Sequence, residues 1–140
     1  MLSQSKGMKE APPLKNRPQI VMVDDDRDFQ SILRGWLTPR YDTISLADGE
    51  ELLHELSTLE PDLVVLDVGL PGPDGFKLCH KIRAESRFTQ IPILFLTGMS
   101  SNRDFCKYLE VGGTAYLTKP VDRSQLLAEI HSLLAESSGA

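Results

Sequence analysis

In Leu63-Val64-Val65-Leu66-Asp67, four consecutive apolar residues are followed directly by an acid. A strand that is apolar at every position is typical of a parallel sheet covered by helices on both faces. A second run of this kind, Ile93-Leu94-Phe95-Leu96, comes later in the chain and ends before Thr97. These two runs are the predicted centre of a buried sheet.

Three further apolar runs flank these two, and each of the five is followed by a stretch with helical periodicity. The further runs are Ile20–Val23, Thr43–Leu46 and Ala115–Leu117. The helical stripes are Phe29, Ile32, Leu33, Trp36 and Leu37; Leu52, Leu53 and Leu56; Phe76, Cys79 and Ile82; Phe105, Tyr108 and Leu109; and Leu126, Leu127, Ile130, Leu133 and Leu134. Five alternations of strand and helix predict an α/β fold: a doubly wound, five-stranded parallel sheet of flavodoxin-like type, with strand order 2-1-3-4-5.

The length of 140 residues suits one domain. Residues 1–17 contain prolines and scattered basic residues without apolar periodicity, which predicts a flexible leader. We expect the folded domain to occupy residues 18–136. Residues 137–140 are then a C-terminal tail or the start of a linker.

Composition disfavours several classes of function. The net charge of −5, from 20 acidic and 15 basic residues, gives no general attraction to a nucleic-acid backbone, so we expect no direct nucleic-acid binding. The chain has neither an apolar run long enough to span a membrane nor a secretory signal, which predicts a cytoplasmic protein. Cys79 and Cys106 have no partner at CxxC spacing, so we interpret them as reduced thiols.

Polar residues follow the predicted strands at the point where each strand ends. Asp24-Asp25-Asp26 follows the first run, Asp67 the third, Thr97 the fourth and Thr118-Lys119 the fifth. The carboxyl ends of parallel strands lie along one edge of the sheet, where ligands of open α/β folds bind. In the order 2-1-3-4-5 the first and third strands are neighbours, so the aspartates are predicted to converge.

Several carboxylates in one cleft repel one another, and a hard divalent cation relieves this repulsion. Oxygen ligands without histidine or cysteine point to Mg²⁺, with Mn²⁺ as an alternative, and such a site commonly includes a phosphate. The Lys119 ammonium and the Thr97 hydroxyl are suited to phosphoryl oxygens. Taken singly, each of these residues is explained as a helix cap, a turn residue or a surface charge; their joint placement favours a site. His54, His80 and His131 lie away from this edge and receive no chemical role.

These motifs resemble the receiver domain of bacterial two-component response regulators over about Arg17 to Ala135. The matching segments, in family order, are Val23–Asp26, Val64–Phe76, Ile93–Gly98 and Gly113–Pro120. The resemblance implies that the chain takes a phosphoryl group from a histidine kinase or a histidine phosphotransfer protein. It would then act as a conformational switch rather than as an enzyme.

The resemblance also implies a set of metal ligands. Asp25 and Asp67 would bind Mg²⁺ directly, Asp24 would act mainly through water, and Gly69 would contribute its backbone carbonyl. Larger residues are usual in the family at the position of Gly69, and alanine is frequent at that of Gly98. The small residue at position 69 suggests easier access of water and a shorter lifetime of the phosphorylated state.

The remaining implied roles concern the phosphoryl group and the switch. Asp67 would be the nucleophile and phosphoacceptor, and Thr97 and Lys119 would hold the phosphoryl group. Tyr116 would be the aromatic switch residue, and the Lys119-Pro120 peptide bond would be cis. The face around the fourth helix and fifth strand would then contact a downstream protein or output domain, and it is the expected place for any homodimer.

Three alternatives follow from related sites and folds. A phosphatase of the haloacid dehalogenase type also uses an aspartate at a strand end, but it needs a second aspartate where this chain has Gly69. A pseudo-receiver would keep the fold without phosphorylation, which the complete set of polar residues disfavours. A flavin-binding protein is disfavoured because aspartates, and no Gly/Ser/Thr-rich phosphate loop, follow the first strand.

Overall fold

The computed structural model describes residues 17–67, 75–98 and 114–139, and within them five parallel strands form one sheet. The strand order is β2-β1-β3-β4-β5, which confirms the predicted topology. The strands are β1 (Gln19–Val23), β2 (Asp42–Leu46), β3 (Leu63–Asp67), β4 (Ile93–Thr97) and β5 (Ala115–Thr118). The helices are α1 (Arg27–Leu37), α2 (Gly49–Glu55), α3 (Gly75–Ala84), the short 3-10 helix η1 (Ser86–Phe88) and α5 (Arg123–Gly139).

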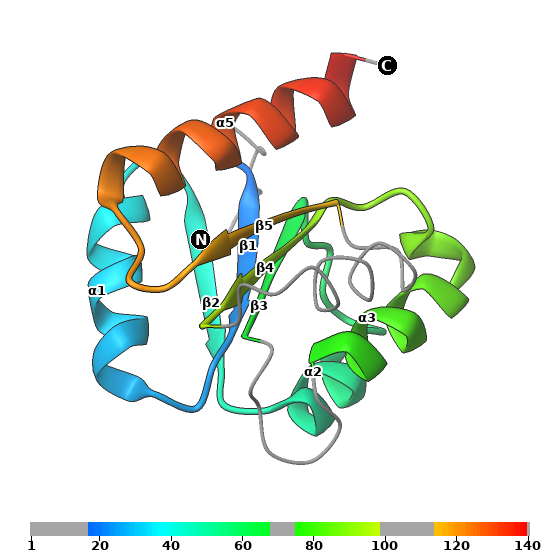
Figure 1. Cartoon of the computed structure of the whole chain (residues 1–140). Coiled ribbons are helices and arrows are strands. Elements are labelled where there is room, and N and C mark those ends of the chain that lie inside the picture. Colours follow the sequence, from blue (N-terminus) through cyan, green and yellow to red (C-terminus); the bar gives the residue numbers. More distant parts are fainter. Residues whose placement is uncertain (1–16, 68–74, 99–113, 140) are drawn as a thin grey trace, which may run out of the picture.

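The helices cover both faces of the sheet, with α1 and α5 on one face and α2 and α3 on the other (Figure 1). Successive strand side chains point to opposite faces, so each strand supplies both layers of the core. Val21, Val64 and Phe95 belong to the core under α2 and α3. Met22, Val65 and Leu94 belong to the core under α1 and α5. The sheet therefore separates two hydrophobic cores.

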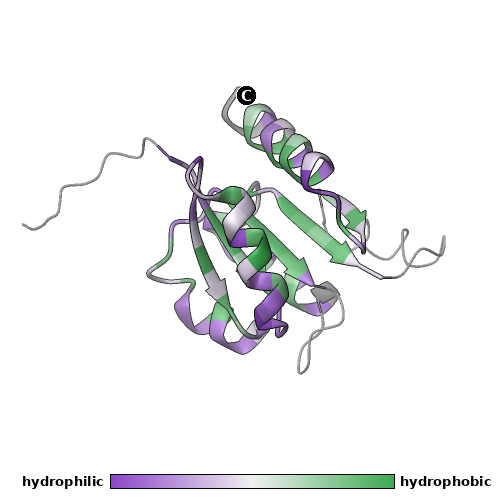
Figure 2. Ribbon diagram, turned by 90° about the vertical axis from the view of Figure 1, so that its left-hand side faces the viewer, coloured by the Kyte–Doolittle hydropathy of each residue, from purple (hydrophilic) through white to green (hydrophobic). Residues whose placement is uncertain are grey.

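Apolar residues are concentrated in the strands and on the helix faces that pack against the sheet. The central strands β3 and β4 are buried at every apolar position, as the unbroken apolar runs predicted. In Figure 2 the strands are largely green, whereas α5, which leads to the C label, carries alternating green and purple bands. Its buried residues Leu126, Ile130 and Leu133 recur at helical spacing and pack on the sheet.

Helix α1 turns its predicted stripe toward the core at Leu33 and Leu37, which are buried, and at Phe29 and Trp36, which are half-buried against it. Its buried residues are Gln30, Leu33 and Leu37, whereas Ile32 is 50% exposed. A step of one residue turns an α-helix by about 100°, so Ile32 cannot share the face of Leu33. The expectation that Ile32 is a core residue was wrong, and a glutamine takes the place that the pattern assigned to apolar side chains.

Aspartates fix where three helices begin. Asp26 is the N-cap of α1 and accepts a hydrogen bond from the Phe29 N–H (3.1 Å). Asp48 caps α2 and accepts from the Glu51 N–H (2.9 Å). Asp122 accepts from the Gln125 N–H (3.0 Å) at the start of α5. An N-cap of this kind satisfies one of the unpaired N–H groups of the first turn, so each helix starts at a defined point after its strand.

Several boundaries differ from the sequence-based expectations. Strands β3, β4 and β5 each extend one residue beyond the apolar run, so that Asp67, Thr97 and Thr118 are final strand residues. Helix α5 continues past residue 136 to Gly139. The predicted helix with Phe105, Tyr108 and Leu109, together with Cys106 and Gly69, lies outside the described residues.

Two further observations complete the fold. The Thr38-Pro39 and Lys119-Pro120 peptide bonds are cis, the second of them as the resemblance implied. Among the helices of residues 17–67, 75–98 and 114–139, none combines the length and apolar character needed to cross a membrane.

Candidate functional site

Three aspartates meet at the carboxyl edge of the sheet. Asp24 and Asp25 follow β1, and Asp67 is the last residue of the neighbouring strand β3. One carboxylate oxygen from each lies within 4.8 Å of the other two. Asp24 is buried, Asp67 is half-buried and Asp25 is exposed, so the cluster opens to solvent on one side. The convergence predicted from strand order is therefore present.

Lys119 enters the same site from the end of β5. Its ammonium lies 3.3 Å from Asp67 Oδ2 and 3.5 Å from Asp24 Oδ2. The same Nζ atom lies 4.8 Å from the centre of the Phe29 ring, a cation–π distance. The ammonium thus bridges the acids of two strands and rests on an aromatic ring of α1.

Thr97 lies on β4, the strand next to that of Asp67, and Tyr116 lies on β5, the strand beyond β4. Thr97 is 6% exposed at the end of β4, and its carbonyl oxygen accepts a hydrogen bond from the Lys119 N–H (2.8 Å). Tyr116 pairs in register with Phe95, two residues before Thr97, and it packs, half-buried, against the core under α2 and α3. The backbone therefore joins Thr97 to Lys119 and keeps Tyr116 on the adjacent strand.

The two carboxylate oxygens of Asp24 differ in their hydrogen bonds. Its Oδ1 accepts a hydrogen bond from the Asp26 N–H (2.9 Å), and its own N–H donates to the Leu46 carbonyl (3.1 Å). Asp24 Oδ2 is buried, and no donor in the described part of the chain hydrogen-bonds to it. A buried carboxylate oxygen in this state is an available ligand atom.

Burial raises the pKa of Asp24 from 3.8 to about 6, because the ionised form loses hydration. The neighbouring Asp67 carboxylate contributes to this raised pKa, whereas the Asp26 N–H and the Lys119 ammonium oppose the rise. The site therefore holds an acid that resists ionisation in the absence of another positive charge.

The donor set fits a hard divalent cation. Three carboxylates against one ammonium leave two negative charges when all groups are ionised, which equals the charge of one divalent ion. Oxygen ligands at a partly open cleft suit Mg²⁺ and also Mn²⁺. Asp24 Oδ2 is buried and has the Lys119 ammonium at 3.5 Å but no hydrogen-bond donor in the described part of the chain, which is a further reason to regard the cluster as a cation site.

The three consecutive aspartates after β1 have separate roles in the structure. Asp24 is buried among the charged groups, Asp25 faces solvent, and Asp26 caps α1. Interpreting strand-end aspartates as helix caps is therefore right for Asp26, whereas Asp24 and Asp25 belong to the acid cluster.

Two residues of the site were missed by sequence reasoning. Phe29 was assigned only to the apolar stripe of α1, although its ring also lies against Lys119. Gln30 received no role, although its side-chain amide reaches the Asp24 carbonyl. A signal for Gln30 exists in the sequence, because Gln30, Leu33 and Leu37 are spaced as one helix face and a glutamine there needs polar partners.

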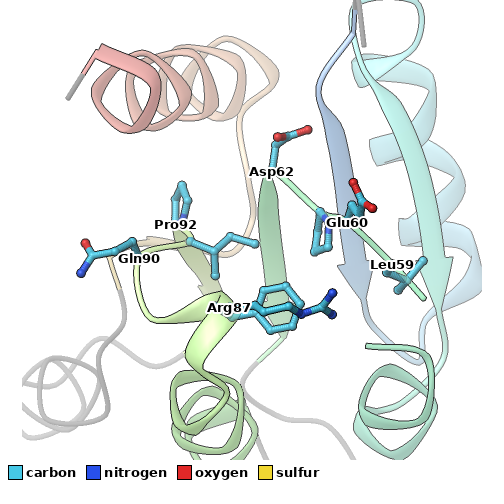
Figure 3. A pocket seen from close by; sticks show the side chains of 9 residues that line it. Leu59, Glu60, Asp62, Arg87, Gln90 and Pro92 are labelled. Atoms are coloured by element: carbon cyan, nitrogen blue, oxygen red, sulfur yellow. The ribbon is translucent and has the colours of Figure 1, made fainter. Parts of the chain in front are cut away.

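A separate hollow of about 390 Å³ lies at the opposite edge of the sheet, around the loops that precede β3 and β4 (Figure 3). Its charged groups take part in the fold. Arg87 donates to the Leu56 carbonyl (2.7 Å) and lies over the Phe88 ring, and Asp62 accepts from the Gln19 N–H (2.8 Å). The amino edge therefore has a structural network, and the carboxyl edge remains the candidate site.

Comparison with known proteins agrees with this assignment. Residues 20–131 match the response regulator receiver domain family. The chain is 38% identical over 120 residues to the transcriptional regulatory protein GltR of Pseudomonas aeruginosa, covering 85% of this chain and 50% of that protein. It is 37% identical over 120 residues to the alkaline phosphatase synthesis transcriptional regulatory protein PhoP of Bacillus subtilis, covering 85% and 49%. The chain thus spans about half the length of these curated relatives.

Solved structures show the same fold. The signal receiver domain of a signal transduction histidine kinase from Syntrophus aciditrophicus superposes with a TM-score of 0.79 at 31% identity, covering 85% of this chain and 91% of that one. A chemotaxis response regulator of Vibrio cholerae gives a TM-score of 0.80 at 27% identity, covering 84% and 98%.

The chain belongs to the response regulator receiver domain family of two-component signalling. Domains of this family are phosphoacceptor switches and not enzymes in the usual sense. The phosphatase and flavin-binding alternatives are thereby set aside, and the question that remains is which residues of this chain carry the switch.

Proposed function

We propose that this receiver domain accepts a phosphoryl group on Asp67, with Mg²⁺ bound in the acid cluster, and changes conformation as a result. The donor would be a histidine kinase or a histidine phosphotransfer protein. The observation that carries the proposal is the convergence at one sheet edge of three carboxylates, within 4.8 Å of one another, and of the Lys119 ammonium, 3.3 Å from Asp67 Oδ2. Because these kinases draw on cellular ATP, a cytoplasmic location forms part of the proposal.

Asp25 and Asp67 are the proposed direct ligands of the metal, with Asp24 acting mainly through water and the Gly69 carbonyl as a further ligand. The open side of the cluster at Asp25 and the buried Oδ2 of Asp24, which accepts no hydrogen bond from the described residues, support this assignment. Bound Mg²⁺ would supply charge neutralisation for phosphoryl transfer.

Asp67 is the proposed nucleophile. One of its carboxylate oxygens forms a bond to phosphorus while the bond between phosphorus and the leaving group of the donor breaks. Lys119, already 3.3 Å from Asp67 Oδ2, is placed to hold a phosphoryl oxygen as negative charge moves onto Asp67. The Thr97 hydroxyl is the proposed hydrogen-bond donor to another phosphoryl oxygen.

Thr97 and Tyr116 are the proposed switch pair. Phosphorylation adds charge that draws the Thr97 hydroxyl toward Asp67, and the space released admits the Tyr116 ring. The strand register supports this coupling, because the two residues lie on paired strands two positions apart. The β5 face would then contact a downstream protein or an output domain, or a second copy of the chain.

The output itself is proposed from the relatives. The two curated relatives are transcriptional regulators, and the 120 residues that match this chain make up about half of each. The net charge of −5 gives this chain no general attraction to DNA. We therefore assign any DNA contact to a separate domain or partner under the control of the receiver.

Intact-mass measurement after incubation with acetyl phosphate and Mg²⁺ tests the proposal. Wild type should gain one phosphoryl group, Asp67→Asn should gain none, and the exposed control Asp42→Asn should behave as wild type. Chelation with EDTA should abolish the gain. A wild-type protein that gains no mass would instead be a pseudo-receiver, and equal gain by Asp67→Asn would move the phosphoacceptor elsewhere.

Self-dephosphorylation is a further part of the proposal. Gly69, which lies outside the described residues, follows the proposed phosphoacceptor by two positions and has no side chain, so we expect water to reach the acyl phosphate easily. Gly69→Met should lengthen its lifetime, measured as the decay of phosphorylated protein in the presence of Mg²⁺. An unchanged lifetime would remove this role for Gly69.

A further inference from the structure

Gln30 is a buried polar residue in the first turns of α1, directly behind the acid cluster. It is 7% exposed and stands on the helix face that otherwise buries leucines. Its Nε2 atom lies 3.0 Å from the Asp24 carbonyl oxygen and 2.9 Å from the Leu46 carbonyl oxygen. The Met22 carbonyl is more distant, at 3.4 Å. The two N–H groups of the amide therefore match the two nearer carbonyls.

These two hydrogen bonds connect Asp24 to the end of strand β2. The Leu46 carbonyl accepts from both the Gln30 amide and the Asp24 N–H (3.1 Å). Asp24 is consequently held at its N–H by Leu46, at its carbonyl by Gln30 and at Oδ1 by Asp26. Asp25 is bonded to the carbonyl carbon that Gln30 fixes, so the same contact limits where the Asp25 carboxylate can lie.

The energetics indicate that Gln30 does more than fill space. Its Oε1 is buried, and no donor in the described ranges hydrogen-bonds to it. A buried polar atom without a partner costs on the order of 1–3 kcal/mol, whereas an apolar side chain of similar shape would avoid this cost. Leu33 and Leu37 show that the same helix face accepts leucine. The glutamine is therefore best explained by what its Nε2 holds.

We propose that Gln30 is a positioning residue for the acid pair Asp24-Asp25, fixing the backbone from which both carboxylates reach the cation site. This inference rests on the proposed function, because it assigns the acid pair to metal binding. Groups that orient metal ligands typically change metal affinity by about 10- to 100-fold when they are removed.

Gln30→Met tests the inference, because methionine keeps the length of the side chain but removes both N–H donors. We expect the variant to fold and to bind Mg²⁺ about 10-fold more weakly than wild type in calorimetric titration. Leu37→Ala is the matched control, because Leu37 is buried on the same helix face at the end far from the acid cluster. It should lose stability and keep the wild-type Mg²⁺ affinity.

Amide hydrogen exchange measured by NMR on the metal-free protein gives a second readout. The Asp24 N–H bonds to the Leu46 carbonyl, so removing the Gln30 bonds should speed exchange at Asp24 in Gln30→Met more than in Leu37→Ala. This readout is independent of any ligand. If Gln30→Met fails to fold, Gln30→Asn, which keeps the amide but shortens its reach, takes its place in both measurements.

The outcomes separate the two proposals. Unchanged Mg²⁺ affinity and unchanged Asp24 exchange in folded Gln30→Met overturn the positioning role and leave the proposed function intact. A wild-type protein that binds no Mg²⁺ overturns the metal site and, with it, the positioning role in metal binding. Equal losses of Mg²⁺ affinity in Gln30→Met and Leu37→Ala would also overturn it, by showing a general effect of helix stability.

Discussion

The Asp24 side chain is 5% exposed, and its pKa is raised to about 6 because ionisation inside the site loses hydration. The raised pKa means that the folded protein holds the ionised carboxylate less readily than the unfolded chain does. Stability linked to this group is therefore highest at low pH, declines as pH rises from about 3.8 toward 6, and stays reduced above that range. At neutral pH the ionised Asp24 carboxylate thus lowers the stability of the metal-free protein, and the same carboxylate is available to a cation.

Asp24→Asn should therefore stabilise the metal-free protein at neutral pH. We expect a gain of roughly 1–3 kcal/mol in the free energy of unfolding at about pH 7.5, shrinking toward zero near pH 4. Urea unfolding in EDTA at the two pH values measures this difference. The exposed control Asp42→Asn should show no such gain, and a gain for Asp24→Asn that does not depend on pH would contradict the explanation.

Phe29 is expected to interact with Lys119 beyond ordinary packing, since the ammonium lies 4.8 Å from the ring centre. A double-mutant cycle with Phe29→Leu and Lys119→Met should give a coupling free energy of about 0.5–1 kcal/mol in the metal-free protein. Thermal or urea unfolding of the four proteins supplies the values. A coupling of zero would mean that the ring serves only as part of the core.

At the start of helix α1, one residue, Asp26, contributes to helix stability through its side chain and to the acid cluster through its backbone. The Asp26 carboxylate caps the helix, whereas its backbone N–H binds Asp24 Oδ1. Asp26→Ala should therefore cost about 1 kcal/mol of stability through the lost cap, because alanine retains the backbone N–H but offers no side-chain acceptor. Mg²⁺ affinity should stay close to that of wild type. A large loss of affinity on calorimetric titration would show that Asp26 acts within the site itself.

The strands were the elements that sequence patterns predicted best. Unbroken apolar runs identified β3 and β4, because both faces of these strands are covered. Their ends were set one residue short, since hydropathy stops at the first polar residue whereas pairing continues through Asp67↔Leu96 and Thr97↔Thr118. On α1 the pattern erred at two positions, because apolar spacing included the exposed Ile32 and passed over the buried Gln30.

For the whole molecule, the sheet divides the interior into two cores that should respond independently to mutation. Ile82 lies in the core under α2 and α3, and Ile130 lies in the core under α1 and α5. Ile82→Val and Ile130→Val should each cost about 0.5–1.5 kcal/mol. Their double mutant should equal the sum within about 0.5 kcal/mol. Strong non-additivity in urea unfolding would show that the sheet transmits packing changes between its faces.

The site could be predicted in outline because topology alone brings strand ends together. Strand order placed Asp24 and Asp25 beside Asp67, and the structure brings their carboxylates within 4.8 Å. Burial was not predictable from the sequence, because aspartate occupies three successive positions and only Asp24 is buried, whereas Asp25 and Asp26 are exposed. The contacts of Gln30 and Phe29 also depend on the path of α1 over the sheet, which residue spacing alone does not give.

The two uncompensated negative charges at the carboxyl edge bear on the kinetics of signalling. An acyl phosphate or a phosphorylated histidine is itself an anion, so the acid cluster without a bound cation would repel the donor that it is proposed to use. A divalent cation that arrives earlier cancels this barrier. We therefore expect ordered binding, with the cation first and the phosphoryl donor second. The rate of phosphorylation should then depend on the fraction of the protein that already has a cation bound.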